Sequence, residues 1–207
     1  MRRQDRLTTL ARLWTTWSRQ GRALSPEQWD RPTRLGDWTV RMLYAHAAGW
    51  PVGFSRLVGM VHEVEPTHAT AAALLRDFNR PGGIATSQAG DVAARARATA
   101  SARTPAELIE PFAVTGPQAI ATARRLGPVV VDYFGRAMLP LEEAVSIGIL
   151  EATVHLLDLQ RALGAPPELP VAGVEHTVAL LAQMAPPVDF IELATGRSTA
   201  ALFPVLR

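Results

Sequence analysis

The stretch that decides the fold runs from residue 140 to residue 163 and reads PLEEAVSIGILEATVHLLDLQRAL. Pro140 and two glutamates form its start, Arg161 lies near its end and Gly164 follows it. Proline and acidic residues favour the first turn of a helix, whereas a basic residue favours the last turn. Apolar residues cover almost every side, so we expect this helix to lie at the centre of a helical bundle.

Ionisable residues interrupt this apolar helix on one side. Glu151, His155 and Asp158 project within about 60° of one line, together with small residues such as Gly148. A buried glutamate without a partner is costly. Glu151 therefore needs either an ion pair with His155 or an arginine, or a divalent metal shared with His155 and a third ligand. The Glu-x-x-x-His spacing occurs often by chance and leaves both readings open.

His46 is the candidate third ligand, within TVRMLYAHAAGWPVG at residues 39–53. Pro51 cannot donate a hydrogen bond to the carbonyl of Ala47, which predicts a kink one turn beyond His46. Kinked helices often open cavities, and Trp50 shares the face of His46. The alternative role for His46 is a core histidine bonded to a backbone carbonyl.

The remaining pattern is helical nearly throughout. We expect an all-α bundle over residues 1–187 and a C-terminal extension, residues 188–207, packed on it. Residues 128–139 fit a strand or a helix, and FIELATGR in the extension predicts a short helix and turn. HEVEPTH at 62–68 reads as a solvated loop despite its histidines and glutamates. Helices are predicted at residues 2–20, 39–62, 71–80, 87–102, 104–126, 140–163 and 171–185.

Composition excludes several classes of chemistry. The chain has 207 residues, no cysteine and no lysine, since all 21 basic residues are arginine. This rules out disulfides, a cysteine nucleophile and a lysine Schiff base. GxSxG, GxGxxG and P-loop patterns are absent. The net charge is only +2 and positive and negative residues are interspersed along the chain, so no basic arm for nucleic acid is present. No apolar run is long enough to cross a membrane. We expect a cytoplasmic protein with no nucleic-acid or membrane partner.

Two segments carry a resemblance to a known family. LSPEQWDRPTRLGDWTVRMLYAH at residues 24–46 contains a W-[ST]-V-R-x-x-x-x-H pattern, and Glu151 to Leu159 fit E-x-x-x-H-x-x-D-L before Leu163 and Gly164. DFNR at 77–80 and ATGR at 194–197 resemble two further stretches. The sequence thus resembles the N-terminal domain family of mycothiol-dependent maleylpyruvate isomerase, within the DinB-like metalloenzyme superfamily. Met42 departs from the pattern, because relatives usually carry an acidic residue there.

The resemblance implies a DinB-like four-helix bundle with extra short helices. It implies a divalent metal, zinc in first place with nickel or iron as alternatives, held by His46, Glu151 and His155. Three such ligands leave a coordination position open, as in catalytic sites. In this family, the open coordination position is expected to bind the sulfur of a low-molecular-weight thiol, which is mycothiol in actinobacteria.

Four further residues receive roles. We expect Asp158 to orient an imidazole from behind the ligands. Arg197 is a candidate clamp for an anionic group of substrate or thiol, or a structural partner of an acid. Trp50 and Tyr44 are candidates for the pocket wall, with core packing as the alternative.

The function implied is an enzyme that activates mycothiol for S-transfer to, or isomerisation of, a small electrophilic substrate. One alternative is a thiol-independent metalloenzyme in a biosynthetic pathway, which uses Lewis-acid or metal-water chemistry. The other is a protein that binds a metal or small molecule without turnover. The chain is expected to be a monomer or a homodimer.

Overall fold

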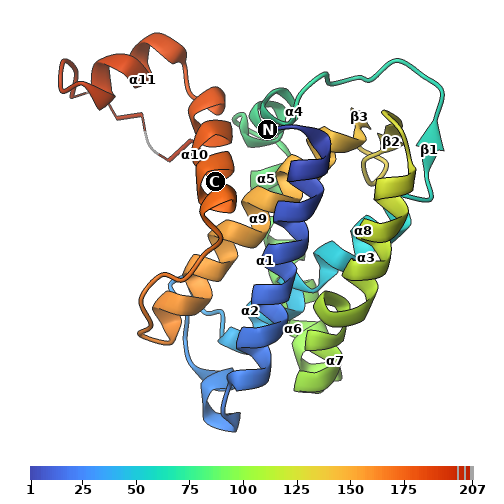
Figure 1. Ribbon diagram of the computed structural model, residues 1–207. Coiled ribbons are helices and arrows are strands. Elements are labelled where there is room, and N and C mark those ends of the chain that lie inside the picture. The colour runs from blue at the N-terminus through green and yellow to red at the C-terminus, as the bar shows by residue number, and fades with distance from the viewer. Residues whose placement is uncertain (200, 203, 206–207) are drawn as a thin grey trace.

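The computed structural model describes residues 1–199, 201–202 and 204–205, and it is mostly helical (Figure 1). A three-stranded antiparallel sheet, in the order β1-β2-β3, is the only sheet among these residues. The helices are α1 Arg3–Ala23, α2 Val40–Ala47, α3 Gly49–Leu57, α4 Ala71–Asn79, α5 Ile84–Ser87, α6 Ala89–Ala102, α7 Pro105–Glu110, α8 Gly116–Arg125, α9 Leu141–Ala162, α10 Val171–Met184 and α11 Pro187–Ala194. The strands are β1 Val61–His62, β2 Val130–Asp132 and β3 Met138–Pro140.

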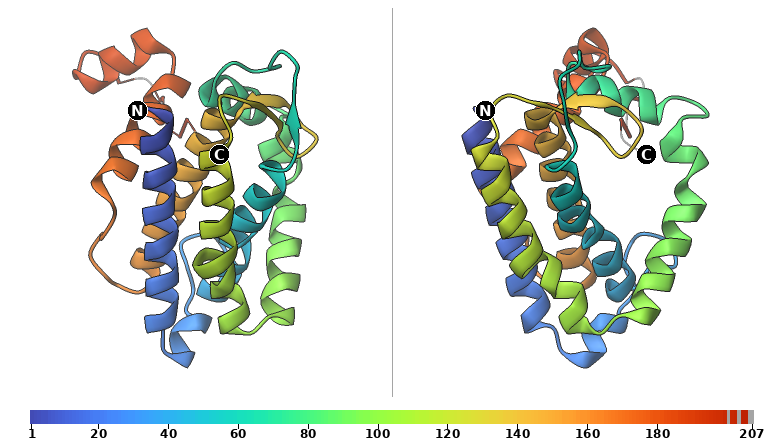
Figure 2. Two further views of the ribbon diagram at one scale, coloured as in Figure 1. Left: turned by 45° about the vertical axis from the view of Figure 1, so that its right-hand side comes forward. Right: turned by 90° about the vertical axis from the view of Figure 1, so that its right-hand side faces the viewer.

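The core is a bundle of α1, the α2–α3 pair, the α7–α8 pair and the central α9 (Figures 1 and 2). Most residues of α9 are buried, as its apolar surface predicts. The inward face of α1 carries Leu10, Leu13 and Trp17, all fully buried. The indole nitrogen of Trp17 donates a hydrogen bond of 3.1 Å to the carbonyl of Ala152, which ties α1 to the middle of α9. The predicted helical bundle is therefore confirmed.

The helix expected at residues 39–62 is in fact two helices, α2 and α3, that meet at Ala48. The break lies directly after Ala47, the residue whose carbonyl Pro51 leaves without a donor. The hydroxyl of Thr39 caps α2 by accepting a hydrogen bond of 3.3 Å from the amide of Met42. The prediction was wrong at the far end, because the chain leaves the helix after Leu57 and forms β1.

Two other segments differ from simple helices. Residues 105–125 form one helical run with a wider π turn at Pro111–Thr115, which begins at Pro111 and is followed by Pro117, and neither proline can donate a backbone hydrogen bond. Residues 128–139 are not a helix, because β2 and β3 pair with Val131 opposite Leu139. The β2–β3 turn places Phe134 at a φ of +56°.

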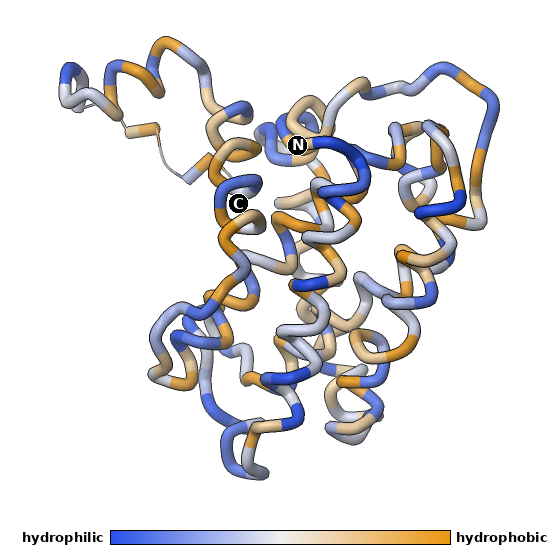
Figure 3. The backbone as a smooth tube through the Cα atoms, viewed as in Figure 1, coloured by the Kyte–Doolittle hydropathy of each residue, from blue (hydrophilic) through white to orange (hydrophobic). Residues whose placement is uncertain are grey.

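Helix α11 projects from the bundle. Helix α11 follows α10, contains no buried residue and projects to one side of the molecule (Figure 1). Both helices contain hydrophobic residues (Figure 3), and several of these are exposed, among them Val171, Val178, Val188 and Ile191. Within the described residues, no single helix is long and apolar enough to cross a membrane, and one pair, α10 with α11, reaches that length and composition with a 119° bend.

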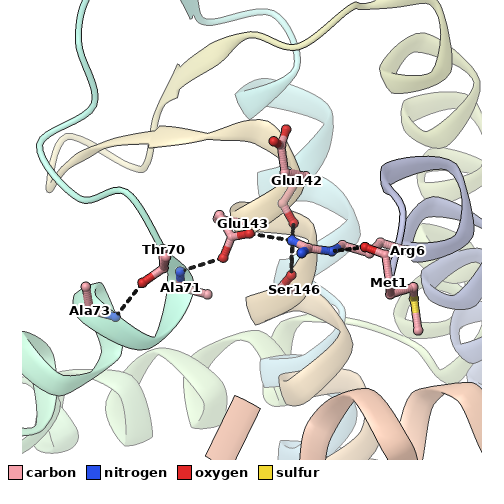
Figure 4. Close-up of polar contacts among 8 residues, drawn as sticks. All are labelled: Met1, Arg6, Thr70, Ala71, Ala73, Glu142, Glu143 and Ser146. Atoms are coloured by element: carbon pink, nitrogen blue, oxygen red, sulfur yellow. Dashed lines mark hydrogen bonds and ion pairs between the residues drawn. The ribbon is translucent and has the colours of Figure 1, made fainter. Parts of the chain in front are cut away.

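A polar cluster fixes the first turn of α9 against its neighbours (Figure 4). The guanidinium of Arg6 on α1 donates to Glu143 at 2.5 Å and to the hydroxyl of Ser146 at 2.8 Å. The second oxygen of Glu143 accepts a hydrogen bond of 2.8 Å from the amide of Ala71, at the start of α4. One carboxylate thus joins three helices. The Arg6 and Glu143 side chains are only 17% and 16% exposed, so solvent screens their ion pair weakly.

We predict that Glu143→Ala lowers the free energy of unfolding by about 1–3 kcal/mol, because it leaves Arg6 part-buried without its carboxylate. Urea denaturation measures the change. The matched control is Glu168→Ala, which removes an exposed ion pair with Arg19 and should cost less than about 1 kcal/mol. Equal effects of the two substitutions would contradict the role given to Glu143.

Candidate metal centre

Three residues predicted as ligands lie together. His46 comes from the last turn of α2, whereas Glu151 and His155 lie one turn apart on α9. One donor atom from each residue falls within 4.8 Å of the other two, and no other such group of histidines and carboxylates occurs in the described part of the chain. The rings of His46 and His155 meet edge to face at a centroid distance of 5.0 Å. Two nitrogens and one carboxylate oxygen are a donor set that suits zinc and other divalent transition metals.

Asp158 holds His155 from the side away from the cluster. Its Oδ2 lies 2.9 Å from Nδ1 of His155, while Nε2 of His155 lies 3.5 Å from Oε2 of Glu151. A hydrogen bond from Nδ1 to a carboxylate fixes the neutral imidazole in the tautomer whose Nε2 has a free lone pair. The geometry is the one expected of a residue that orients a metal ligand.

Arg34 is a site residue that the sequence analysis missed. Its Nε donates a hydrogen bond of 2.6 Å to Oδ1 of Asp158. The Asp158 side chain is 3% exposed and that of Arg34 is 55% exposed, so the guanidinium reaches a buried carboxylate from the surface. Arg34 lies in the turn-rich segment before α2. This segment has no helix or strand repeat in its sequence that would show where the Arg34 side chain points.

Burial and charge set the protonation of the two histidines in opposite ways. Burial, together with the neighbouring charge of His155, lowers the pKa of His46 to about 4. Burial also opposes the charged form of His155, but hydrogen bonds with Asp158 and Glu151 outweigh it and raise the pKa to about 9.

Glu151 is charged for a related reason. Burial favours its neutral form, yet the contact with His155 and a hydrogen bond from Trp50 leave its pKa below the ordinary value. Without a metal, the protein therefore balances two carboxylates, part-buried Glu151 and buried Asp158, with a protonated His155 and Arg34. A divalent cation between the donors would supply the same kind of compensation, so the residues fit a metal.

Two cavities meet at His46. The larger has a volume of about 610 Å³ and includes the whole triad and Asp158, with apolar walls that contain Leu75 and Phe78. The smaller has a volume of about 480 Å³ and is lined by Trp50, Phe134 and two arginines among others. His46 and Val92 line both cavities. Reactants could therefore approach the triad from two sides.

The structure does not bring every candidate to this site. Trp50 lines the smaller cavity, but Tyr44 lies in the core, where its hydroxyl donates 3.1 Å to the carbonyl of Trp17. Tyr44 is therefore a packing residue in this structure and lines neither cavity. Arg197 is exposed beyond α11, where its side chain contacts only the carbonyl of Thr195 within the described residues.

The histidines of the 62–68 segment also lie outside the triad. His62 belongs to the exposed strand β1. The imidazole of His68 lies 3.9 Å from Asp77 on α4.

Comparisons with known proteins place this geometry in context. The profile of the mycothiol maleylpyruvate isomerase N-terminal domain matches residues 10–160. A crystal structure of the mycothiol-dependent maleylpyruvate isomerase superposes with a TM-score of 0.58 at 20% identity, over 88% of this chain and 68% of that chain. A histidine-to-alanine mutant of that enzyme gives a TM-score of 0.57 over the same shares, also at 20% identity. No curated protein sequence matches significantly.

We predict that Asp158→Asn weakens zinc binding by about 10–100-fold, because the amide no longer accepts the Nδ1 hydrogen bond as a carboxylate does. Competition with a chromogenic chelator measures the affinity. Arg34→Met should weaken binding in the same direction but less. Arg97→Met, which removes an exposed ion pair with Asp37, is the matched control and should leave the affinity unchanged. An unchanged affinity in Asp158→Asn would refute the positioning role.

Proposed function

The chain belongs to the mycothiol maleylpyruvate isomerase N-terminal domain family, and on that premise we propose that it is a metal-dependent enzyme that activates a low-molecular-weight thiol. The observation that carries the proposal is the convergence of His46, Glu151 and His155 within 4.8 Å, open to two cavities. A structural metal site is normally closed by four protein ligands, whereas three ligands beside a cavity leave room for a reactant.

The thiol comes from outside the protein, because the chain contains no cysteine. When a divalent cation is bound, it favours the deprotonated form of a thiol at neutral pH, which is the strong nucleophile. Mycothiol is the thiol named in the family, and we propose it as the co-substrate and zinc as the metal, with nickel or iron as alternatives.

The chain's own residues orient the donors and exclude water. Asp158 accepts hydrogen bonds from His155 and Arg34 and so holds the ring of His155, while Trp50 lies beside the carboxylate of Glu151 and helps keep it ionised. The apolar walls of the larger cavity shield an electrophile from bulk water next to the triad.

Two reaction classes fit a thiolate in such a pocket. In S-transfer, a sulfur–carbon bond forms and a leaving group departs with the bonding electrons. In isomerisation, the thiolate adds to an activated double bond, the resulting single bond rotates, and the thiolate leaves again. Both consume or return a thiol without any oxidant.

The first test is metal content. We predict about one zinc, nickel or iron ion per chain by mass spectrometry of protein purified without chelator, and its loss in His46→Ala and His155→Ala. The double variant His62→Ala/His68→Ala is the matched control and should keep the metal, since both residues lie outside the triad. A wild type that is metal-free and also refuses added zinc would overturn the proposal.

The second test is thiol dependence. We predict that the zinc-loaded protein conjugates mycothiol to 1-chloro-2,4-dinitrobenzene or isomerises maleylpyruvate, and that absorbance shows no turnover when the thiol is omitted. His155→Ala should lose the activity while its circular dichroism stays unchanged. Turnover at the same rate without thiol would instead support Lewis-acid or metal-water chemistry at the triad.

A further inference from the structure

The smaller cavity beside His46 has a charge pattern that the metal site does not explain. Arg56 from α3 and Arg95 from α6 both line it, and its lining contains no aspartate or glutamate. Neither guanidinium makes a hydrogen bond or ion pair with another residue that the structure describes. The nearest acidic ligand, Glu151, lines the larger cavity instead. Two exposed, positively charged residues therefore line one cavity whose wall contains no acidic side chain.

Part of the wall of this cavity is aromatic, formed by Trp50 and by Phe134, which is 44% exposed. Phe134 is the one non-glycine residue with positive φ in the described part of the chain. Such a conformation costs about 1 kcal/mol or more and tends to persist where the surroundings impose it. Its ring packs edge to face on Trp50 at a centroid distance of 6.2 Å.

Gly53 provides the room for this ring. A Cβ atom at position 53 would come within 3.0 Å of Cε1 of Phe134, so a larger residue would displace it. Trp50 is also close enough to Glu151 to help lower the pKa of that carboxyl group. The aromatic wall is thus connected to a residue of the triad.

We propose that the cavity is a binding subsite for a flat organic carboxylate, with Arg56 and Arg95 on the carboxylate and the aromatic wall against the body of the ligand. Guanidinium groups bind carboxylates through charge-assisted hydrogen bonds. The aromatic rings offer an apolar face to a planar group. A ligand held there has its far end beside His46, so the subsite selects anionic electrophiles for the reaction proposed above. The inference deepens the proposed function, but the binding itself needs no metal.

Benzoate and its uncharged counterpart benzamide test the proposal. Ligand-observed NMR measures their dissociation constants for the chelator-treated and the zinc-loaded protein. We expect benzoate to bind both forms, and benzamide to bind at least about tenfold more weakly, because it lacks the charge. The double variant Arg56→Met/Arg95→Met should weaken benzoate binding by about tenfold or more and leave benzamide unchanged.

Controls separate a lost subsite from other causes. Arg12→Met removes an exposed arginine of α1 that lines neither cavity, and it should bind benzoate like the wild type. Melting temperature establishes that the double variant folds, and the single variants Arg56→Met and Arg95→Met replace it if it does not. Zinc content measured on the same samples reports separately on the metal site.

Three outcomes would overturn the subsite. They are equal binding of benzoate and benzamide, unchanged benzoate binding in the arginine variants, and benzoate binding only when zinc is present, which would mean coordination by the metal. If the wild type binds no zinc but the arginine-dependent benzoate binding remains, the subsite stands and the proposed enzymatic function fails.

Discussion

A carboxylate inside a helical bundle requires a positive neighbour, and Glu151 imposes that requirement at the centre of this molecule. Its side chain lies on α9 among apolar residues that hold the bundle together and is only 21% exposed, so it is largely removed from water. Asp158, one turn beyond His155 on the same helix, adds a second buried negative charge. His155 lies between the two carboxylates and contacts both, and Arg34 forms an ion pair with Asp158 from the protein surface. A bound cation would satisfy the same electrostatic requirement.

The rest of the bundle keeps this cluster in place. The indole of Trp17 bonds to the carbonyl of Ala152, the residue directly after Glu151. Arg6 and Glu143 fix the start of α9 to α1 and α4. Rigid elements position reactive groups more accurately than loops do, and both α9 ligands belong to a helix of which most residues are buried. The smaller cavity, in contrast, lies beside the break between α2 and α3 and the β2–β3 turn, and the larger cavity is lined mainly by α4, α6 and α9.

The sequence predicts α9 to within one residue at each end, because proline, acidic residues and glycine mark its limits. Helical register alone also places Glu151, His155 and Asp158 together. The pairing with His46 depends on the resemblance, since no spacing rule links residues on different helices. Tyr44 was predictable as a core residue, because residues two positions apart project from nearly opposite sides of a helix, and Tyr44 therefore points away from the site that contains His46. Arg34 and strand β1 were not predictable, since turns and two-residue strands carry too little pattern, and the sequence left residues 128–139 open between a strand and a helix.

The ion pair between Arg34 and Asp158 joins the segment before α2 to the candidate metal centre. Free energies that link two parts of one molecule act in both directions. If an ordered Arg34 holds His155 ready for a cation, then a bound cation makes that same segment more ordered. The segment before α2 and the candidate metal centre are then thermodynamically coupled, so the order of this surface segment depends on whether a cation is bound.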